Sequence, residues 1–247
     1  NSPFQYYHTT AFFHPDWGAL NLAQLAAMVD TPENQIKLLD NWHFLFKSDE
    51  IVKTIKEFNP DVVGISNSTD GDTPSVGKIG EEIKKKFPKI ILISGGQAAT
   101  ANYKYLLEQG FDFVAIGEGE HTFKELVGKL NKGEKKFYDV KGLIFLDNNR
   151  IIKTPERPFI ENLDELPMPA RKYQPKLKSI FFPNRYSSEI ETARGCPYGC
   201  DYCSITAFFK KTLRKKSNEK ILEELRDIKY NIGATQVYFI DDAFGIN

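Results

Sequence analysis

All three cysteines of this 247-residue chain lie in one stretch, RGCPYGCDYC at residues 194–203. Cys196, Cys200 and Cys203 have the spacing C-x3-C-x2-C. An odd number of closely spaced cysteines is a poor basis for disulfides, whereas clustered thiolates are common ligands of metals and iron–sulfur clusters. The stretch therefore predicts a metal or redox site.

Two simpler interpretations compete with a cluster. Buried apolar thiols do not require this spacing in a turn that contains Pro197 and Gly199. Structural zinc takes four ligands, but there is no fourth cysteine, and all the histidines lie far away in sequence: His8, His14, His43 and His121. A [4Fe–4S] cube normally takes four thiolates, so three leave one iron open to a small chelating molecule. The pattern favours such a cluster, with zinc and inert thiols as alternatives.

Composition argues against several classes of protein. The 33 basic residues balance the 33 acidic ones, which removes the electrostatic footprint of a nucleic-acid-binding protein. The longest apolar runs, such as residues 90–93, are far shorter than the ~20 residues that span a bilayer. No signal peptide is recognisable, and clustered thiols suit a reducing compartment. We therefore expect a cytoplasmic protein without nucleic-acid or membrane partners.

The first half of the chain alternates apolar runs with helix-like segments such as residues 48–58, which begin at the cap Ser48. Strands rich in Val and Ile without polar alternation are typical of a parallel sheet covered on both faces. We predict strands at 35–40, 61–66, 89–96 and 111–119, in a doubly wound, flavodoxin-like α/β domain over residues 1–135. Ligands of such sheets bind at the carboxyl edge, here the loops 66–72, 94–98 and 117–121.

The rest of the chain predicts two further parts. Residues 136–186 contain a β-hairpin that turns at Asp147-Asn148-Asn149, then a proline-rich linker on the surface. Residues 187–247 predict a strand–helix–strand unit with the cysteines after its first strand. We expect Asn231 and Gly233 to end its helix, and four apolar side chains to point inward: Ile221, Leu222, Leu225 and Ile228.

The cysteine motif after a first strand, with Tyr202 just before the last cysteine, resembles the radical S-adenosylmethionine family. The resemblance implies a partial TIM barrel whose cysteine loop binds a [4Fe–4S] cluster and S-adenosylmethionine. It also implies that Tyr202 contacts the adenine and that Asp241 and Asp242 meet the amino group of the methionine moiety. One electron from the cluster would then generate a 5′-deoxyadenosyl radical that takes hydrogen from the substrate.

The first domain resembles the cobalamin-binding domain that precedes the barrel in one branch of that family. The resembling segments are residues 15–26, 59–66 and 115–127. They imply that the nucleotide tail of cobalamin lies beside two serines and two glycine-containing turns, which are Ser66, Ser68, Gly95, Gly96 and Gly117-Glu118-Gly119. Glycine suits these positions because it permits close approach of the backbone.

Two features depart from the cobalamin pattern. Ser68 stands where the tail motif has leucine, and the Asp-x-His-x-x-Gly sequence that ligates cobalt in some relatives is missing. His14 has the wrong spacing from Asp16 and Gly18, so we expect no protein histidine on cobalt. Trp17 is a candidate to cover the lower face of the cobalamin, and packing under the first helix is the alternative.

The resemblance implies a cobalamin-dependent radical enzyme that methylates an unactivated carbon of a small molecule, with a flavodoxin or ferredoxin as electron donor. Cobalamin-assisted cyclisation or rearrangement is the runner-up, and a non-catalytic module stabilised by metal or cluster is a third interpretation. Only about sixty residues follow Ser187, while a full α/β barrel needs about 250. We therefore expect the chain to end inside the radical domain.

Overall fold

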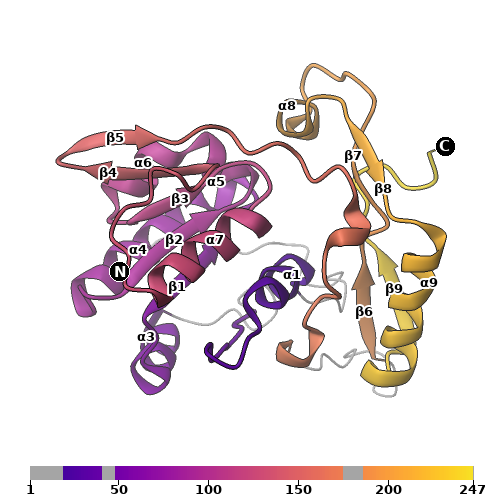
Figure 1. Ribbon diagram of the computed structural model, residues 1–247, viewed down its shortest axis with the longest axis horizontal. Helices are drawn as coiled ribbons and strands as arrows, with labels where there is room; N and C mark the ends of the chain where they lie inside the picture. The colour runs from indigo at the N-terminus through magenta and orange to yellow at the C-terminus, as the bar shows by residue number, and fades with distance from the viewer. Residues whose placement is uncertain (1–18, 41–47, 175–185, 247) are drawn as a thin grey trace, which may run out of the picture.

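The computed structural model describes residues 19–40, 48–174 and 186–246. Its first half is built on a sheet whose strands are, in spatial order, β1 (Val62–Ser66), β2 (Ile91–Gly95), β3 (Phe113–Ala115), β4 (Leu143–Asp147) and β5 (Arg150–Lys153). β1, β2 and β3 run parallel, and β4 and β5 form an antiparallel hairpin that pairs with β3 (Figure 1).

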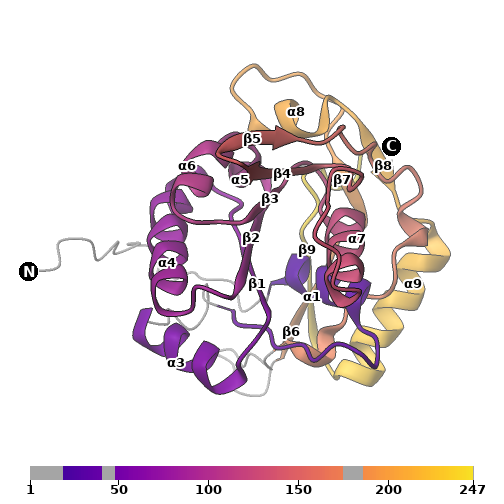
Figure 2. The ribbon, with the colours of Figure 1, turned by 60° about the vertical axis from the view of Figure 1, so that its left-hand side comes forward.

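Helices cover both faces of this sheet (Figure 2). One side carries α3 (Ser48–Phe58), η1 (Asp70–Asp72), α4 (Thr73–Lys86), α5 (Gln97–Ala101) and α6 (Tyr103–Glu108); the other carries α1 (Leu20–Val29) and α7 (Glu120–Asn131). Consecutive strand residues point to opposite faces. Leu92 and Val114 join the core under α4 and α6, and Ile93 and Phe113 join the core under α7. The predicted α/β class is confirmed.

The strand expected at 35–40 does not form, since these residues have no strand pairing. Ile36 and Leu38 instead line a cavity together with Ile65 of β1. The segment thus contributes apolar side chains opposite the sheet and no backbone hydrogen bonds to it. An apolar run of this length cannot be distinguished from a strand by its pattern alone.

The predicted hairpin is confirmed, and its turn residues explain its shape. Asn148 and Asn149 both have positive φ angles, 47° and 61°. Two such residues give the turn whose twist matches that of the flanking strands. This hairpin adds two strands to the first sheet, so the sheet continues past residue 135. The division of the chain into domains at 1–135, 136–186 and 187–247 stays a prediction.

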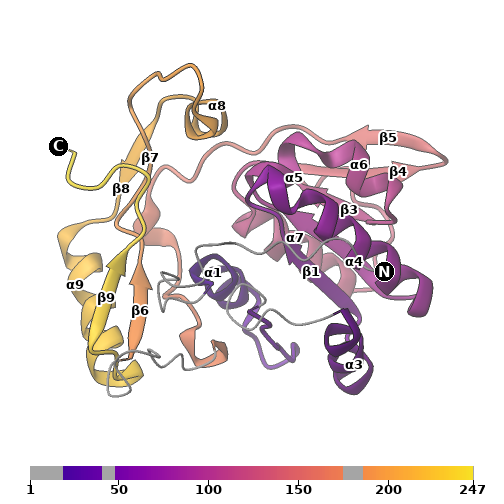
Figure 3. The same cartoon turned by 180° about the vertical axis from the view of Figure 1, so that it is seen from behind.

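The proline-rich linker is partly a core element. It contains the 3₁₀ turns η2 (Leu163–Glu165) and η3 (Arg171–Tyr173). Ile160, Leu163 and Leu166 are buried against Met28 and Val29 of α1. Figures 1 and 3 show α1 between the first sheet and the C-terminal strands. The expectation of a purely superficial linker is therefore wrong, because these apolar side chains bury α1.

The C-terminal part contains the predicted strand–helix–strand unit. Its elements are β6 (Ser187–Ile190), β7 (Ala193–Gly195), α8 (Ser204–Phe209), β8 (Leu213–Lys215), α9 (Asn218–Arg226), the π-helical turn η4 (Asp227–Ile232) and β9 (Gln236–Phe239). β6 and β9 pair in parallel, with α9 between them in sequence. β7 and β8 form a separate antiparallel pair around the cysteines.

The packing of α9 corrects one expected inward residue. Ile221, Leu225 and Ile228 face the strands, but Leu222 is 50% exposed because it lies on the opposite face of the helix. Gly233 ends the helical segment with φ 78°, as its type predicts.

Among the helices in the described ranges, none is long and apolar enough to cross a membrane.

Candidate functional site

The cysteine loop, residues 196–212, connects β7 to β8. Gly195 begins it with φ 86°, and a Cβ atom there would lie 2.3 Å from the carbonyl oxygen of Thr212. Only glycine lets the two ends of the loop come this close. The glycine directly before Cys196 is thus required by the local backbone structure.

The three thiols are accessible. All are free cysteines, Cys200 is exposed, and Cys196 and Cys203 are partly exposed. Tyr202 is 94% exposed. Within the ranges that the structure describes, no three His, Cys, Asp or Glu side chains are grouped so as to hold a metal ion. The donor set still fits an iron–sulfur cube with one open iron, because three accessible thiols on one short loop can bind three of its four irons.

Asp241 and Asp242, which follow β9, hold the backbone before the cysteine loop. Asp241 accepts hydrogen bonds from the backbone N–H groups of Thr192 (2.6 Å) and Ala193 (3.1 Å), and also from the Thr192 hydroxyl. Asp242 accepts from the N–H of Gly195 at 3.0 Å. Burial raises the pKa of Asp242, although this hydrogen bond opposes the shift. Their predicted contact with S-adenosylmethionine stays a prediction.

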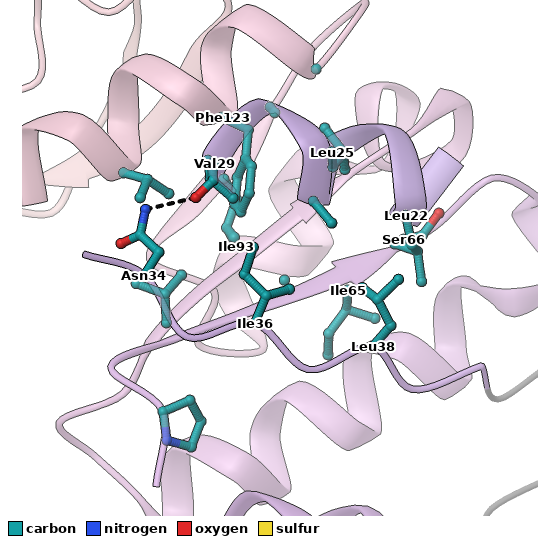
Figure 4. Close-up of a pocket in the computed structure, with 18 of the residues that line it drawn as sticks. Leu22, Leu25, Val29, Asn34, Ile36, Leu38, Ile65, Ser66, Ile93 and Phe123 are labelled. Carbon is teal, nitrogen blue, oxygen red and sulfur yellow. Dashed lines mark hydrogen bonds between the residues drawn. The ribbon is translucent and has the colours of Figure 1, made fainter. Parts of the chain in front are cut away.

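A cavity of about 570 Å³ lies on the face of the first sheet that carries α1 and α7. Figure 4 shows Leu22, Leu25 and Val29 of α1 on one side of it, and Ile65 and Ile93 on the sheet side. Small residues on the three parallel strands open this space: Gly64, Gly95 and Ala115. Such a mostly apolar, concave space is typical of a binding site for a large organic ligand.

Most residues predicted to contact cobalamin line this cavity: Ser66, Gly95, Gly96, Gly117 and Gly119. Ser68 is not among the lining residues, but its hydroxyl lies 3.3 Å from that of Ser66. Glu118 is also absent from the lining, because its carboxylate points to two arginines of the C-terminal part, Arg194 and Arg214. The expected role of Glu118 in the cobalamin slot therefore lacks support from its position.

The glycine turn that lines the cavity lies beside the cysteine loop. Gln97 begins α5 directly after Gly96, and Ser204 begins α8 directly after Cys203. The Ser204 hydroxyl lies 3.5 Å from Oε1 of Gln97. The glycine turn at the carboxyl edge of the sheet is thus a neighbour of the cysteine loop.

Comparison with known proteins agrees with this geometry. A family model described as a B12 binding domain matches residues 9–127. An uncharacterised methyltransferase of Pyrococcus horikoshii is 36% identical, over 92% of this chain and 49% of that protein. An anaerobic magnesium-protoporphyrin IX monomethyl ester cyclase of Synechocystis is 27% identical, over 78% of this chain and 38% of that protein.

A solved structure has the same fold. The cobalamin-dependent S-adenosylmethionine radical enzyme OxsB, with aqua-cobalamin and S-adenosylmethionine bound, matches with a TM-score of 0.72 and 20% identity, over 92% of this chain and 32% of that one. Residues 9–127 of this chain thus belong to the B12 binding domain family, and the chain has the fold of this radical S-adenosylmethionine enzyme. It spans about half the length, or less, of these curated relatives.

Several further residues contribute to the cavity and were not predicted from the sequence. Asn21 of α1 donates a hydrogen bond to the Ser66 hydroxyl at 2.9 Å, which orients one of the predicted cobalamin contacts. Phe123 of α7 and Ile36 also line the cavity. No signal in the sequence shows that Phe123 faces a cavity. Trp17 and His14 lie outside the described residues.

Gly96 has a backbone conformation that only glycine adopts easily. Its φ is 116° and its ψ is 177°. A Cβ atom at this position would lie 2.6 Å from the carbonyl oxygen of Asn67. The loop after β1 and the loop after β2 approach each other closely here, so the fold requires glycine at position 96 whether or not a ligand binds.

We expect Gly96→Ala to lower the free energy of unfolding by about 1–3 kcal/mol, the usual cost of a side chain in this region of φ and ψ. Gly119→Ala is the matched control, because Gly119 also lines the cavity, has φ −84°, and its nearest atom to a new Cβ is 3.8 Å away. Urea unfolding of both variants measures the difference. Equal stability of the two variants would contradict the assigned strain.

Proposed function

We propose that this chain forms the cofactor-binding part of a cobalamin-dependent radical S-adenosylmethionine enzyme that methylates an unactivated carbon of a small molecule. The observation that supports the proposal is the 3.5 Å contact between Gln97 and Ser204, which brings the glycine turn of the first sheet beside the cysteine loop. A methyl carrier and a radical source must act on the same substrate, so their sites have to adjoin. The name of the Pyrococcus relative as a methyltransferase also supports methyl transfer.

Each cofactor has residues that fit it. Cys196, Cys200 and Cys203 would hold the [4Fe–4S] cluster, and Tyr202 is exposed and available to cover an adenine. When bound, the cluster supplies an electron for cleavage of S-adenosylmethionine, and cobalamin supplies a carrier for the methyl group. The cavity beside Ser66 would take the nucleotide tail of cobalamin, where apolar side chains exclude water.

The chain's own polar groups keep the cysteine loop in place. Asp241 and Asp242 accept hydrogen bonds from the backbone of residues 192, 193 and 195, directly before Cys196. Charge-assisted hydrogen bonds of this kind are stronger than neutral ones. These two aspartates therefore orient the loop from the end of the neighbouring parallel strand, whether or not they also contact S-adenosylmethionine.

The electron for the cluster has to come from another protein. We propose a cytoplasmic flavodoxin or ferredoxin, since the cysteine loop is open to solvent at Cys200 and two exposed lysines lie in or beside it, Lys211 and Lys215, while Lys210 pairs with Glu156. A positive surface attracts an acidic donor and speeds its encounter with the protein. No nucleic-acid partner is proposed.

Cobalamin-assisted cyclisation is the second candidate, because a magnesium-protoporphyrin ester cyclase is also similar to this chain. A module whose cluster or zinc only stabilises the fold is the third. The three differ in what the protein does with S-adenosylmethionine, so one set of experiments separates them.

The test begins with anaerobic reconstitution of the chain with iron, sulfide and cobalamin. We expect about four irons per chain, as a cube requires, and cobalamin that stays with the protein through gel filtration. With a reductant and methyl-labelled S-adenosylmethionine, label should appear in the protein-bound corrinoid fraction. Cofactor binding without labelled corrinoid would favour the cyclase-like reaction. A colourless protein with one zinc per chain would refute both enzyme candidates.

A further inference from the structure

Glu118 connects three segments that are far apart in the sequence. It lies between β3 and α7, and its side chain is only 4% exposed. Oε1 accepts hydrogen bonds from Nη1 of Arg194 (3.1 Å) and Nη1 of Arg214 (2.9 Å). Oε2 accepts from the backbone N–H of Ile160 at 2.7 Å. One buried carboxylate therefore joins the first domain to β7, to β8 and to the linker.

The two arginines frame the cysteine loop. Arg194 and Arg214 are opposite each other in the β7–β8 pair, and Arg194 stands two residues before Cys196. Arg194 also binds Glu191 and Glu120, each at 2.7 Å. The guanidinium of Arg214 lies 4.8 Å from the ring centroid of Phe159. These other contacts hold both arginine side chains in place independently of Glu118.

The charges of this group depend on one another. Burial alone would raise the pKa of Glu118, but the hydrogen bond from Arg214 and the charge of Arg194 outweigh it and hold the pKa below its ordinary value. Glu118 is thus ionised, and its removal would take the carboxylate from the buried Arg214, while Arg194 would keep Glu120 and Glu191.

The loop of Glu118 has two faces. Gly117 and Gly119, its neighbours on both sides, line the cavity, while Glu118 itself points to the strands that border the cysteine loop. We propose that Glu118 is a positioning residue, which sets the placement of the cysteine loop relative to the cavity of the cobalamin-binding domain. The proposal rests on the proposed function, because that placement matters when both sites are loaded.

Hydrogen exchange on the whole chain tests the positioning without any cofactor. In Glu118→Gln we expect amide exchange in residues 193–195 and 213–215 to become about tenfold faster or more, as loss of charged hydrogen bonds implies. Exchange in β1 and β2 should not change. Glu125→Gln is the matched control, since Glu125 also joins α7 to the linker, through Arg157 at 2.5 Å, but is 46% exposed. It should leave β7 and β8 unchanged.

Unchanged exchange in β7 and β8 of Glu118→Gln would overturn the proposal, and so would equal acceleration throughout the chain, which indicates general destabilisation. If Glu118→Gln does not fold, Arg214→Gln tests the same prediction, because Glu118 then keeps its ion pair with Arg194. The exchange experiment does not depend on the proposed function, so its failure is distinct from a failure to bind cofactors.

A second measurement uses the loaded protein. With equal iron and cobalamin contents, paramagnetic resonance of the reduced cluster beside Co(II) reports their magnetic coupling, which depends on the distance between them. We expect this coupling to change or to become heterogeneous in Glu118→Gln and to stay as in wild type in Glu125→Gln. Unchanged coupling in Glu118→Gln would overturn the positioning role. A wild-type chain that binds neither cofactor would instead refute the proposed function.

Discussion

Replacing Cys200 by alanine is expected to remove the iron–sulfur cluster completely. The cysteine loop has three thiols, and the variant would keep only two. Two thiolates cannot hold a four-iron cube. After anaerobic reconstitution, iron should fall from about four per chain to the level of a non-specific background, and the brown absorption should disappear. Iron and sulfide analysis with a visible spectrum measures both changes.

The control for this variant is Asp201→Asn, in the same loop. Asp201 lies directly after Cys200 and its side chain is exposed. It is not a predicted ligand, so this variant should keep the full iron content. If Cys200→Ala retained four irons, another residue would have to supply a ligand. If both variants lost the cluster equally, the loop conformation rather than the thiol would be responsible.

The second large effect is expected at Glu224, which lies in α9 and is completely buried. Its Oε1 pairs with Arg171 of the linker at 2.5 Å, and its Oε2 pairs with Lys216 after β8 at 2.7 Å. The two cations are 1% and 4% exposed. Glu224→Ala leaves both charges buried without their partner, which costs about 3–5 kcal/mol of unfolding free energy. Urea unfolding followed by circular dichroism measures this loss.

The neighbouring residue provides a matched control. Glu223 is 61% exposed and pairs with Lys220 at 3.3 Å on the surface of the same helix. Glu223→Ala should cost at most about 1 kcal/mol, since exposed ion pairs contribute little. Similar losses in the two variants would show that the buried ion pairs of Glu224 do not decide the result, because alanine has a higher helix propensity than glutamate and cannot cause a loss at either position. A loss below about 1 kcal/mol in Glu224→Ala would contradict the assigned role of the pair.

Glu224 and Glu118 have comparable roles at the same strand pair, Glu118 at its centre and Glu224 just after the end of β8. Glu224 binds Lys216, which directly follows β8, and Glu118 binds Arg194 of β7 and Arg214 of β8. Each also reaches the linker, through Arg171 or through Ile160. The cysteine loop is therefore supported by buried charges from both the first domain and α9.

Much of the fold follows from local patterns in the sequence. Glycine and asparagine determine turns through the φ angles that they allow, as at Gly195, Gly233 and Asn148-Asn149. The order strand, cysteines, helix, strand is confirmed in β6, α9 and β9. The cysteine spacing itself indicates the chemistry, because three thiols on one loop need no tertiary contact to be recognised.

Tertiary structure alone decided which side chains support the site. The sequence places Asp241 and Asp242 after a strand, but their hydrogen bonds go to residues 192–195, which are brought beside them by the parallel pairing of β6 and β9. Short apolar runs do not show whether they pair as strands or line a cavity, so residues 35–40 were mispredicted. Glu118 reads as part of a glycine-rich turn, and only the packing of two domains turns its charge toward Arg194 and Arg214. Partners 76 and 96 residues away in the chain leave no local pattern in the sequence.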